Sequence, residues 1–85
     1  MIEIPRTVIV ARRQGYPDRV AGIYTHFEDL NWKLTDLHIS CKGLQVEFRL
    51  YPTTDAWGNS MPKPTVEEMF EEGMSSTEYI EYVRD

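Results

Sequence analysis

Residues 37–51, LHISCKGLQVEFRLY, carry the clearest pattern in this chain of 85 residues. Apolar and polar side chains alternate on both sides of a central Lys42-Gly43 dipeptide. The apolar members of this alternation are Leu37, Ile39, Cys41, Leu44, Val46, Phe48 and Leu50. A period of two indicates a strand with one buried face, and a dipeptide ending in glycine suits a tight turn. The stretch therefore predicts a β-hairpin.

The register of this hairpin can be checked against the residue types that it opposes. With the turn at Lys42-Gly43, one face pairs apolar residues, namely Cys41 with Leu44, Ile39 with Val46, and Leu37 with Phe48. The other face pairs residues of complementary charge, namely His38 with Glu47 and Asp36 with Arg49. Attractive cross-strand pairs stabilise a sheet, and a slip of one residue would reverse both faces. The two patterns agree on one register.

Two further strands are expected upstream. Residues 4–12 are rich in β-branched side chains, and residues 20–27 follow after a turn-forming segment at 14–18. Residues 27–34 fit more than one structure. A capping box at Thr25 and Glu28 favours a helix, whereas alternating Leu30, Trp32 and Leu34 favour a strand. We favour a tight turn followed by a strand over 32–41, with a bulge at Thr35-Asp36.

Two short helices are expected in the C-terminal segment. Pro52 ends the last strand, and residues 52–64 form a loop that contains Trp57. Thr65 with Glu68, and Ser75 with Glu78, have the spacing of capping boxes that begin helices. The inward-facing residues would be Val66, Met69 and Phe70 in the first helix, which ends at Gly73, and Tyr79, Ile80 and Val83 in the second. Helices that pack on one sheet face and helices that project from the sheet both fit the sequence.

The chain length predicts a single domain over 1–85, with a sheet in 1–51, a loop in 52–64 and an acidic helical segment in 65–85. The expected fold class is α+β, a four-stranded antiparallel meander followed by two short C-terminal helices. Cys41 is the only cysteine, so no internal disulfide can form. No apolar run approaches the ~18 residues of a membrane span, and the N-terminus lacks the charge order of a signal peptide. We expect a cytoplasmic protein.

The acidic residues are unevenly distributed. The segment from Thr65 to Asp85 holds seven carboxylates and one cation, about −6 in charge, whereas residues 1–64 carry about +1. Glu67 and Glu71 are four residues apart, as are Glu68 and Glu72, so that like charges repel on one helix face. Carboxylates near a helix C-terminus also oppose the helix dipole. Such a surface either keeps the protein in solution or binds a positively charged partner.

Catalytic and metal-binding arrangements find little support in the sequence. In the predicted hairpin Cys41 faces the core and His38 the opposite side, so the two cannot form a catalytic pair. No ligand spacing typical of a metal site and no phosphate-binding glycine loop is present. We expect a protein that is not an enzyme and has no cofactor. Basic residues beside the first turn (Arg12, Arg13 and Arg19, with Tyr16) resemble a nucleic-acid contact, but the net charge of −5 disfavours one.

A partner-binding surface is therefore the leading hypothesis. Interfaces favour tryptophan and tyrosine as anchors, although Trp57 could equally fold back over the sheet edge. The residues expected to bind the partner are Trp57, Glu67, Glu68, Glu71, Glu72, Glu78, Glu81, Tyr82 and Asp85. No membrane partner is expected.

The expected function is inhibition of a larger protein whose basic groove handles nucleic acid, such as a nuclease or CRISPR-type complex. A phage-encoded anti-defence (anti-CRISPR-type) protein, acting by nucleic-acid mimicry in the host cytoplasm, would have this design. A bacteriocin-type immunity protein would use the same physics. A different alternative is an accessory or structural subunit that binds by edge-strand addition or forms a homodimer.

Overall fold

The computed structural model describes residues 2–53 and 65–84 of the chain, and of Arg84 only its backbone. Its elements, in chain order, are β1 (Glu3–Arg13), β2 (Arg19–His26), α1 (Phe27–Ser40), β3 (Val46–Pro52), α2 (Val66–Glu72) and α3 (Ser76–Arg84). The fold is α+β, built on a three-stranded antiparallel sheet with three helices. The predicted class is confirmed, whereas the predicted number of strands and helices is not.

The sheet is formed around β1. The strand order is β2-β1-β3, so β1 pairs with both neighbours and is the central strand. Thr7 lies opposite Tyr24 on one side and opposite Pro52 on the other. The first two strands were predicted with nearly the same bounds, as was the strand that ends at Pro52. A register shift between Ile9 and Val10 places one extra residue in β2.

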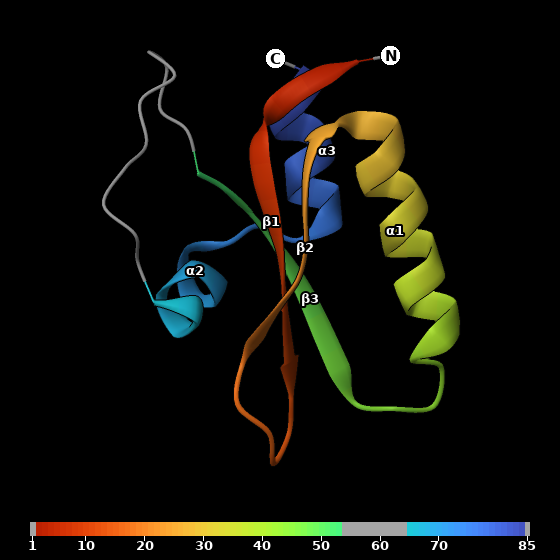
Figure 1. The fold of residues 1–85 in the computed structure, drawn as a ribbon, viewed down its shortest axis with the longest axis vertical. Helices are drawn as coiled ribbons and strands as arrows, with labels where there is room; N and C mark the ends of the chain where they lie inside the picture. Colours follow the sequence, from red (N-terminus) through yellow and green to blue (C-terminus); the bar gives the residue numbers. More distant parts are fainter. Residues whose placement is uncertain (1, 54–64, 85) are drawn as a thin grey trace.

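Helices cover both faces of this sheet. Figure 1 shows the sheet nearly edge-on, with α1 on one side and α2 on the other. On the α1 side the buried residues are Ile4, Ile9, Leu30, Leu34, Leu50 and Tyr79. On the α2 side they are Val8, Val10 and Phe70. The opposite directions of Val8 and Ile9 follow from the alternation along β1, as the sequence predicts.

The predicted strand over 32–41 is wrong, because these residues belong mostly to helix α1. The hairpin at Lys42-Gly43 is therefore also wrong, and β3 pairs with β1 instead. Leu30 and Leu34 are buried one turn apart and Leu37 packs against the same core, which is the spacing of a helix. Ile39, assigned to the core by the strand pattern, is 70 % exposed. The expected partners of Glu47 and Arg49 were wrong for the same reason.

Helix α1 ends at Ser40, and Gly43 lies in the turn that follows the helix rather than in a hairpin. Its φ is +86°, a conformation that glycine adopts without the strain of a side chain. Just before it, the Cys41 amide donates to the Leu37 carbonyl at 2.9 Å and the Lys42 amide to the Ile39 carbonyl at 3.3 Å. These bonds close the last turn of α1. A glycine with positive φ serves a helix end and a hairpin equally well, so the dipeptide alone could not distinguish them.

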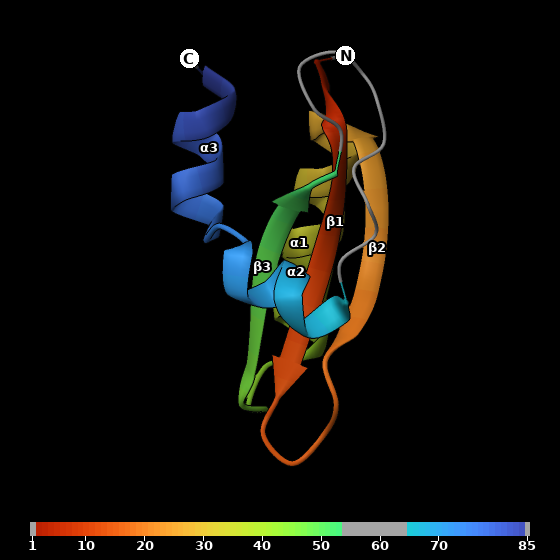
Figure 2. The ribbon, with the colours of Figure 1, turned by 90° about the vertical axis from the view of Figure 1, so that its left-hand side faces the viewer.

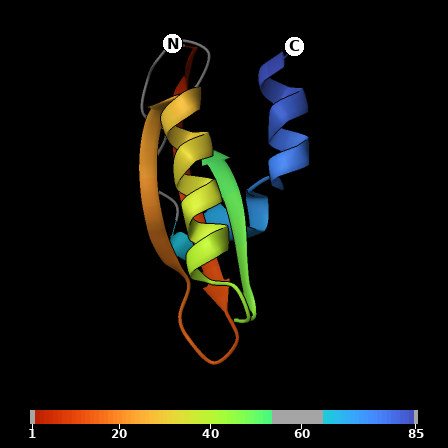
Figure 3. The ribbon, with the colours of Figure 1, turned by 90° about the vertical axis from the view of Figure 1, so that its right-hand side faces the viewer.

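Helices α2 and α3 begin and end where the sequence predicts, but they do not cover the same face. Figure 3 shows α1 in front of the sheet, with α3 running beside β3. Tyr79 of α3 joins the core on the α1 side, whereas Phe70 of α2 packs on the opposite side. Between the helices, Met74 and Leu50 exchange backbone hydrogen bonds of 2.8 and 2.9 Å. This short bridge allows the chain to pass from one face to the edge of β3.

Candidate functional site

Helix α2 presents four glutamates from a firmly anchored backbone. Its cap is the predicted one, because the Glu68 amide donates to the Thr65 hydroxyl at 3.2 Å. Phe70 is only 3 % exposed and fixes the inner side of the helix to the sheet. The four carboxylates of Glu67, Glu68, Glu71 and Glu72 all belong to exposed residues. Their charge is therefore held at a defined place on the surface.

Two arginines from the sheet hold the inner side of α2. The guanidinium carbon of Arg12 lies 4.0 Å from the centre of the Phe70 ring, and that of Arg49 lies 4.8 Å away. Cations over an aromatic face are attracted by its quadrupole. Arg49 also donates to the Phe70 carbonyl at 3.4 Å. Of the basic residues that could have contacted nucleic acid, Arg12 is thus used to dock a helix.

Among the described side chains, Glu71 is the one α2 glutamate that forms an ion pair. The Arg12 guanidinium lies 2.8 Å from Asp18 and 3.1 Å from Glu71. The hydrogen bond from Arg12 holds the pKa of Asp18 below its usual value. Arg49 is paired with Glu47 at 2.9 Å. Both arginines that pack on Phe70 are therefore also paired with acidic side chains.

Glu68 and Glu72 lie close enough to Tyr51 of β3 to affect its titration. The pKa of Tyr51 is raised, first by burial and then by the negative charges of Glu72 and Glu68. A nearby negative charge disfavours the phenolate, which is the direction seen. These two carboxylates therefore bring negative charge from α2 toward the edge of the sheet.

Helix α3 carries the remaining described acids and is fixed by a buried tyrosine. The Glu78 amide donates to the Ser75 hydroxyl at 3.2 Å, which is the first bond of the predicted capping box, and this hydroxyl donates to the Glu78 carboxylate at 3.1 Å. Tyr79 is fully buried, and the oxygen atoms of its hydroxyl and of Thr7 are 2.7 Å apart. Burial raises the pKa of Tyr79. Tyr82 is 47 % exposed, and Ile80, which was predicted to face inward, is 38 % exposed.

Most of the predicted acidic residues lie on the surface, and most of them form no ion pair with the described side chains. Within residues 2–53 and 65–83, whose side chains the structure describes, no ion pair involves Glu67, Glu68, Glu72, Glu78 or Glu81. Figure 2 shows α2 lying across the sheet and α3 running up beside it, so the two helices face different directions. Trp57 and Asp85 lie outside the described residues. We call the exposed carboxylates of these two helices (Glu67, Glu68, Glu72, Glu78 and Glu81) the acidic surface.

The sequence interpretation missed an exposed aromatic on α1. Trp32 is 73 % exposed and lies beside a groove of about 350 Å³ on the outer side of the helix. Ile39, two turns later, lines the same groove. The signal was present in the spacing of Leu30 and Leu34, because a helix with these residues inside must turn Trp32 outward.

The argument that excluded a pair of Cys41 and His38 assumed a strand, and it no longer holds because His38 belongs to helix α1. On a helix, residues three apart are neighbours, so His38 and Cys41 lie on the same turn rather than on opposite faces of a strand. Among the side chains that the structure describes, no hydrogen bond joins them. His38 instead packs edge-on against Phe48, with ring centres 5.6 Å apart. The absence of enzymatic activity stays a prediction.

The described residues contain no group of three or more histidine, cysteine or acidic side chains placed to hold a metal ion. In the same parts of the chain, none of the helices is long and apolar enough to cross a bilayer.

Comparison with known proteins gives no further guide. No family model, curated protein or solved structure matches this chain.

Proposed function

We propose that this chain is a small protein inhibitor that uses its acidic surface to bind a basic groove on a larger nucleic-acid-handling protein. The observation that carries the proposal is the set of five exposed carboxylates on two anchored helices, none of which forms an ion pair with a described side chain. A nuclease or CRISPR-type complex, whose groove attracts phosphates, has the complementary charge. A phage-encoded anti-defence protein is the design that we favour.

The cost of this arrangement to the helices supports a binding role. Helix α2 has acidic residues in its first turn, where the dipole favours them, but no basic residue in its last turn, where Glu71 and Glu72 lie. Like charges four residues apart on one helix are also unfavourable. A surface selected for stability alone would include a lysine at these positions. Charge kept against local preference is typical of a functional surface.

Anchoring of both helices also favours specific binding over simple solubility. Phe70 of α2 and Tyr79 of α3 are buried on opposite sides of the sheet. A shift of either helix relative to the sheet would therefore expose a large aromatic ring. A partner would meet carboxylates that are already positioned, and less conformational entropy would be lost on binding. The long-range field of the surface would also accelerate the encounter at low salt.

The test compares two variants that remove the same number of negative charges. The first variant, Glu67→Gln/Glu68→Gln/Glu72→Gln, neutralises the α2 part of the acidic surface and leaves the Glu71–Arg12 pair intact. The control variant, Glu3→Gln/Asp29→Asn/Asp36→Asn, changes three acids in β1 and α1 instead. Urea unfolding should show that both variants fold, with the first as stable as the wild type or slightly more stable.

Each protein is immobilised and used to capture a partner from a host lysate, and the captured partner is then purified. We expect the control variant to bind it like the wild type, and the first variant to bind about tenfold or more weakly, mainly through a slower on-rate. Added duplex DNA should displace the partner, and rising salt should weaken the complex steeply. Equal affinity for both variants, or indifference to DNA, would refute the proposal.

The second candidate function, an accessory subunit that binds by strand addition or forms a homodimer, is favoured by one separate observation. β2 is an edge strand, and its Val20 and Ile23 side chains are 43 and 56 % exposed. However, the extra residue in β2 opposite Ile9 and Val10 makes a bulge, which disfavours pairing at an edge. Light scattering tests the homodimer directly, since a monomer at high concentration would exclude it.

A further inference from the structure

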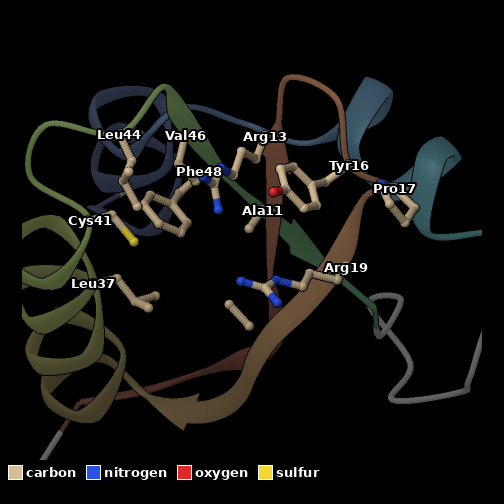
Figure 4. A pocket seen from close by; sticks show the side chains of 11 residues that line it. Ala11, Arg13, Tyr16, Pro17, Arg19, Leu37, Cys41, Leu44, Val46 and Phe48 are labelled. Carbon is tan, nitrogen blue, oxygen red and sulfur yellow. The ribbon is translucent and has the colours of Figure 1, made fainter.

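A cavity of about 290 Å³ lies between the C-terminal end of α1, the loop that follows it and the β1–β2 hairpin. Figure 4 shows side chains from all these segments converging on it. Most of its lining is apolar and comes from Ala11, Ala21, Leu37, Leu44, Val46 and Phe48. Cys41 from the end of α1 and Tyr16 and Pro17 from the hairpin complete the apolar part. The volume is near the lower end of the ~300–1,000 Å³ typical of small-molecule sites.

Two arginines give one side of this cavity a positive charge. Arg13 comes from the end of β1 and Arg19 from the start of β2. Figure 4 shows the Arg19 guanidinium directed into the space between the apolar side chains. The guanidinium carbon of Arg13 lies 4.4 Å from the centre of the Tyr16 ring, which holds it at the rim. The cavity is therefore apolar on the α1 side and cationic on the hairpin side.

The charge of these arginines is not neutralised by the surrounding structure. Over the described side chains, neither Arg13 nor Arg19 forms an ion pair, although the adjacent Arg12 is paired with both Asp18 and Glu71. Arg12 points to the α2 side of the sheet, where it stacks on Phe70, so it does not compete for the cavity. Among the described side chains, Arg13 and Arg19 are thus unpaired cations at the border of an apolar cavity, where they could serve a ligand of opposite charge.

We propose that this cavity binds a small monocarboxylate with an apolar tail, such as a medium-chain fatty acid. The tail would lie among Leu37, Leu44 and Phe48, and the carboxylate would face Arg19 and Arg13. Guanidinium groups match a carboxylate with two parallel hydrogen bonds, and burial of the tail supplies hydrophobic free energy. The small volume and largely apolar lining disfavour nucleotides and other ligands with several phosphates. The cavity shares no lining residue with the acidic surface, so the proposed site is separate from it.

Three probes separate the contributions of the tail and the charge. Octanoate has both, octanol has the tail without the charge, and propionate has the charge with a much shorter tail. Titration calorimetry, with amide NMR shifts to locate the site, should show saturable one-to-one binding of octanoate. We expect octanol and propionate to bind at least about tenfold more weakly, because each lacks one part of the recognition. The shifted amides should include Ala11, Ala21 and Leu44, which line the cavity.

A matched pair of variants tests the role of the two arginines. Arg13→Gln/Arg19→Gln removes both positive charges at the cavity, and Arg6→Gln/Lys33→Gln removes two charges elsewhere. The first variant should bind octanoate about tenfold or more weakly, and the second within about twofold of the wild type. The proposal is overturned if octanoate shows no saturable binding below its micellar concentration. It is equally overturned if octanol binds as well as octanoate, if both variants behave alike, or if the NMR shifts map to the groove beside Trp32.

Discussion

The buried contact between Thr7 and Tyr79 allows a quantitative test of how α3 is docked. The Thr7 hydroxyl donates to the Pro5 carbonyl at 2.7 Å, and its oxygen lies 2.7 Å from the Tyr79 hydroxyl. A threonine hydroxyl has a single hydrogen, which the Pro5 carbonyl already receives. Tyr79 must therefore be the donor in the second bond. Both residues are 0 % exposed, so water cannot replace either partner.

This assignment predicts unequal costs for the two single substitutions. Tyr79→Phe removes a donor and leaves Thr7 still bonded to Pro5, which should cost about 0.5–1.5 kcal/mol of unfolding free energy. Thr7→Val leaves the Tyr79 hydroxyl buried without an acceptor and should cost more, about 1–3 kcal/mol. In the double variant no unpaired hydroxyl remains, so its cost should be well below the sum of the two. An 85-residue domain has about 4–13 kcal/mol of stability in total, so these differences are measurable.

Urea unfolding followed by circular dichroism measures all four proteins of this cycle. The m-value should stay constant, because the folded and unfolded surfaces hardly change. If Tyr79→Phe proved as costly as Thr7→Val, the donor assignment would be wrong. If both substitutions cost less than about 0.5 kcal/mol and added without coupling, Tyr79 would not be buried against β1, and the position of α3 would have to be revised.

Three further substitutions probe the other contacts that position the helices. Phe70→Ala should lower the unfolding free energy by about 3–5 kcal/mol, because it opens a cavity on the α2 side of the core. As a control, Trp32→Ala at an exposed position should change the unfolding free energy little. Equal costs of the two substitutions in urea unfolding would contradict the fold. Asp18→Asn should reduce the loss of stability in acid, because Arg12 lowers the folded-state pKa of Asp18. The stabilisation that the Asp18 carboxylate contributes is complete above the ordinary aspartate pKa of about 3.9 and is lost as the pH falls from there through the lower folded-state pKa. Thermal unfolding over a pH series would measure this difference. If the variant and the wild type lost the same amount of stability at low pH, the result would count against the ion pair. Gly73→Ala should lower the unfolding free energy by about 1–3 kcal/mol. A Cβ at this position would lie 2.9 Å from the Met69 carbonyl oxygen and 3.3 Å from the Leu50 carbonyl oxygen. If urea unfolding showed no loss of stability, α2 would be able to shift.

The parts of the fold that depend on local sequence were predicted well. The strands β1 and β2 with their turn, the strand β3, and the caps of α2 and α3 each follow from patterns within about ten residues. Gly73 was correctly placed at the end of α2, although for a different reason. Its φ is −71°, which any residue can adopt, so the close approach of the Met69 carbonyl and of β3, rather than a left-handed conformation, makes a side chain unfavourable there.

The error over 32–41 arose because two periodicities coexist in the same residues. Leu37, Ile39 and Cys41 alternate like a strand, but Leu30, Leu34 and Leu37 recur like a helix. The choice depends on a contact distant in sequence, the pairing of β3 with β1, which occupies the edge that a hairpin partner would have used. Once β3 pairs with β1, the helical stripe is the one that reaches the core. No local pattern contains this information.

The candidate surfaces show the same division between local and distant information. The exposure of Glu67, Glu68 and Glu72 could be predicted from helix spacing alone. The pairing of Glu71 with Arg12 could not, since it brings together residues from opposite ends of the chain. The cavity between α1 and the hairpin was also beyond prediction, because Leu37 and Phe48 were expected to face each other across a hairpin rather than to line a space.

The positions of the arginines connect the acidic surface with the proposed carboxylate site. Arg12 and Arg49 face α2, where Phe70 and three acidic side chains occupy them, so neither adds positive charge to the outer side of that helix. Arg13 and Arg19 lie at the cavity on the α1 side of the sheet. Among the described side chains, the unpaired glutamates of α2 (Glu67, Glu68 and Glu72) and the two unpaired arginines of the cavity thus lie on opposite sides of the sheet. Glutamate-to-glutamine changes on α2 should weaken partner binding without altering octanoate affinity, and loss of Arg13 and Arg19 should do the reverse. If either set of substitutions affected both ligands equally, the two surfaces would not be independent, and overall charge rather than local geometry would explain the binding.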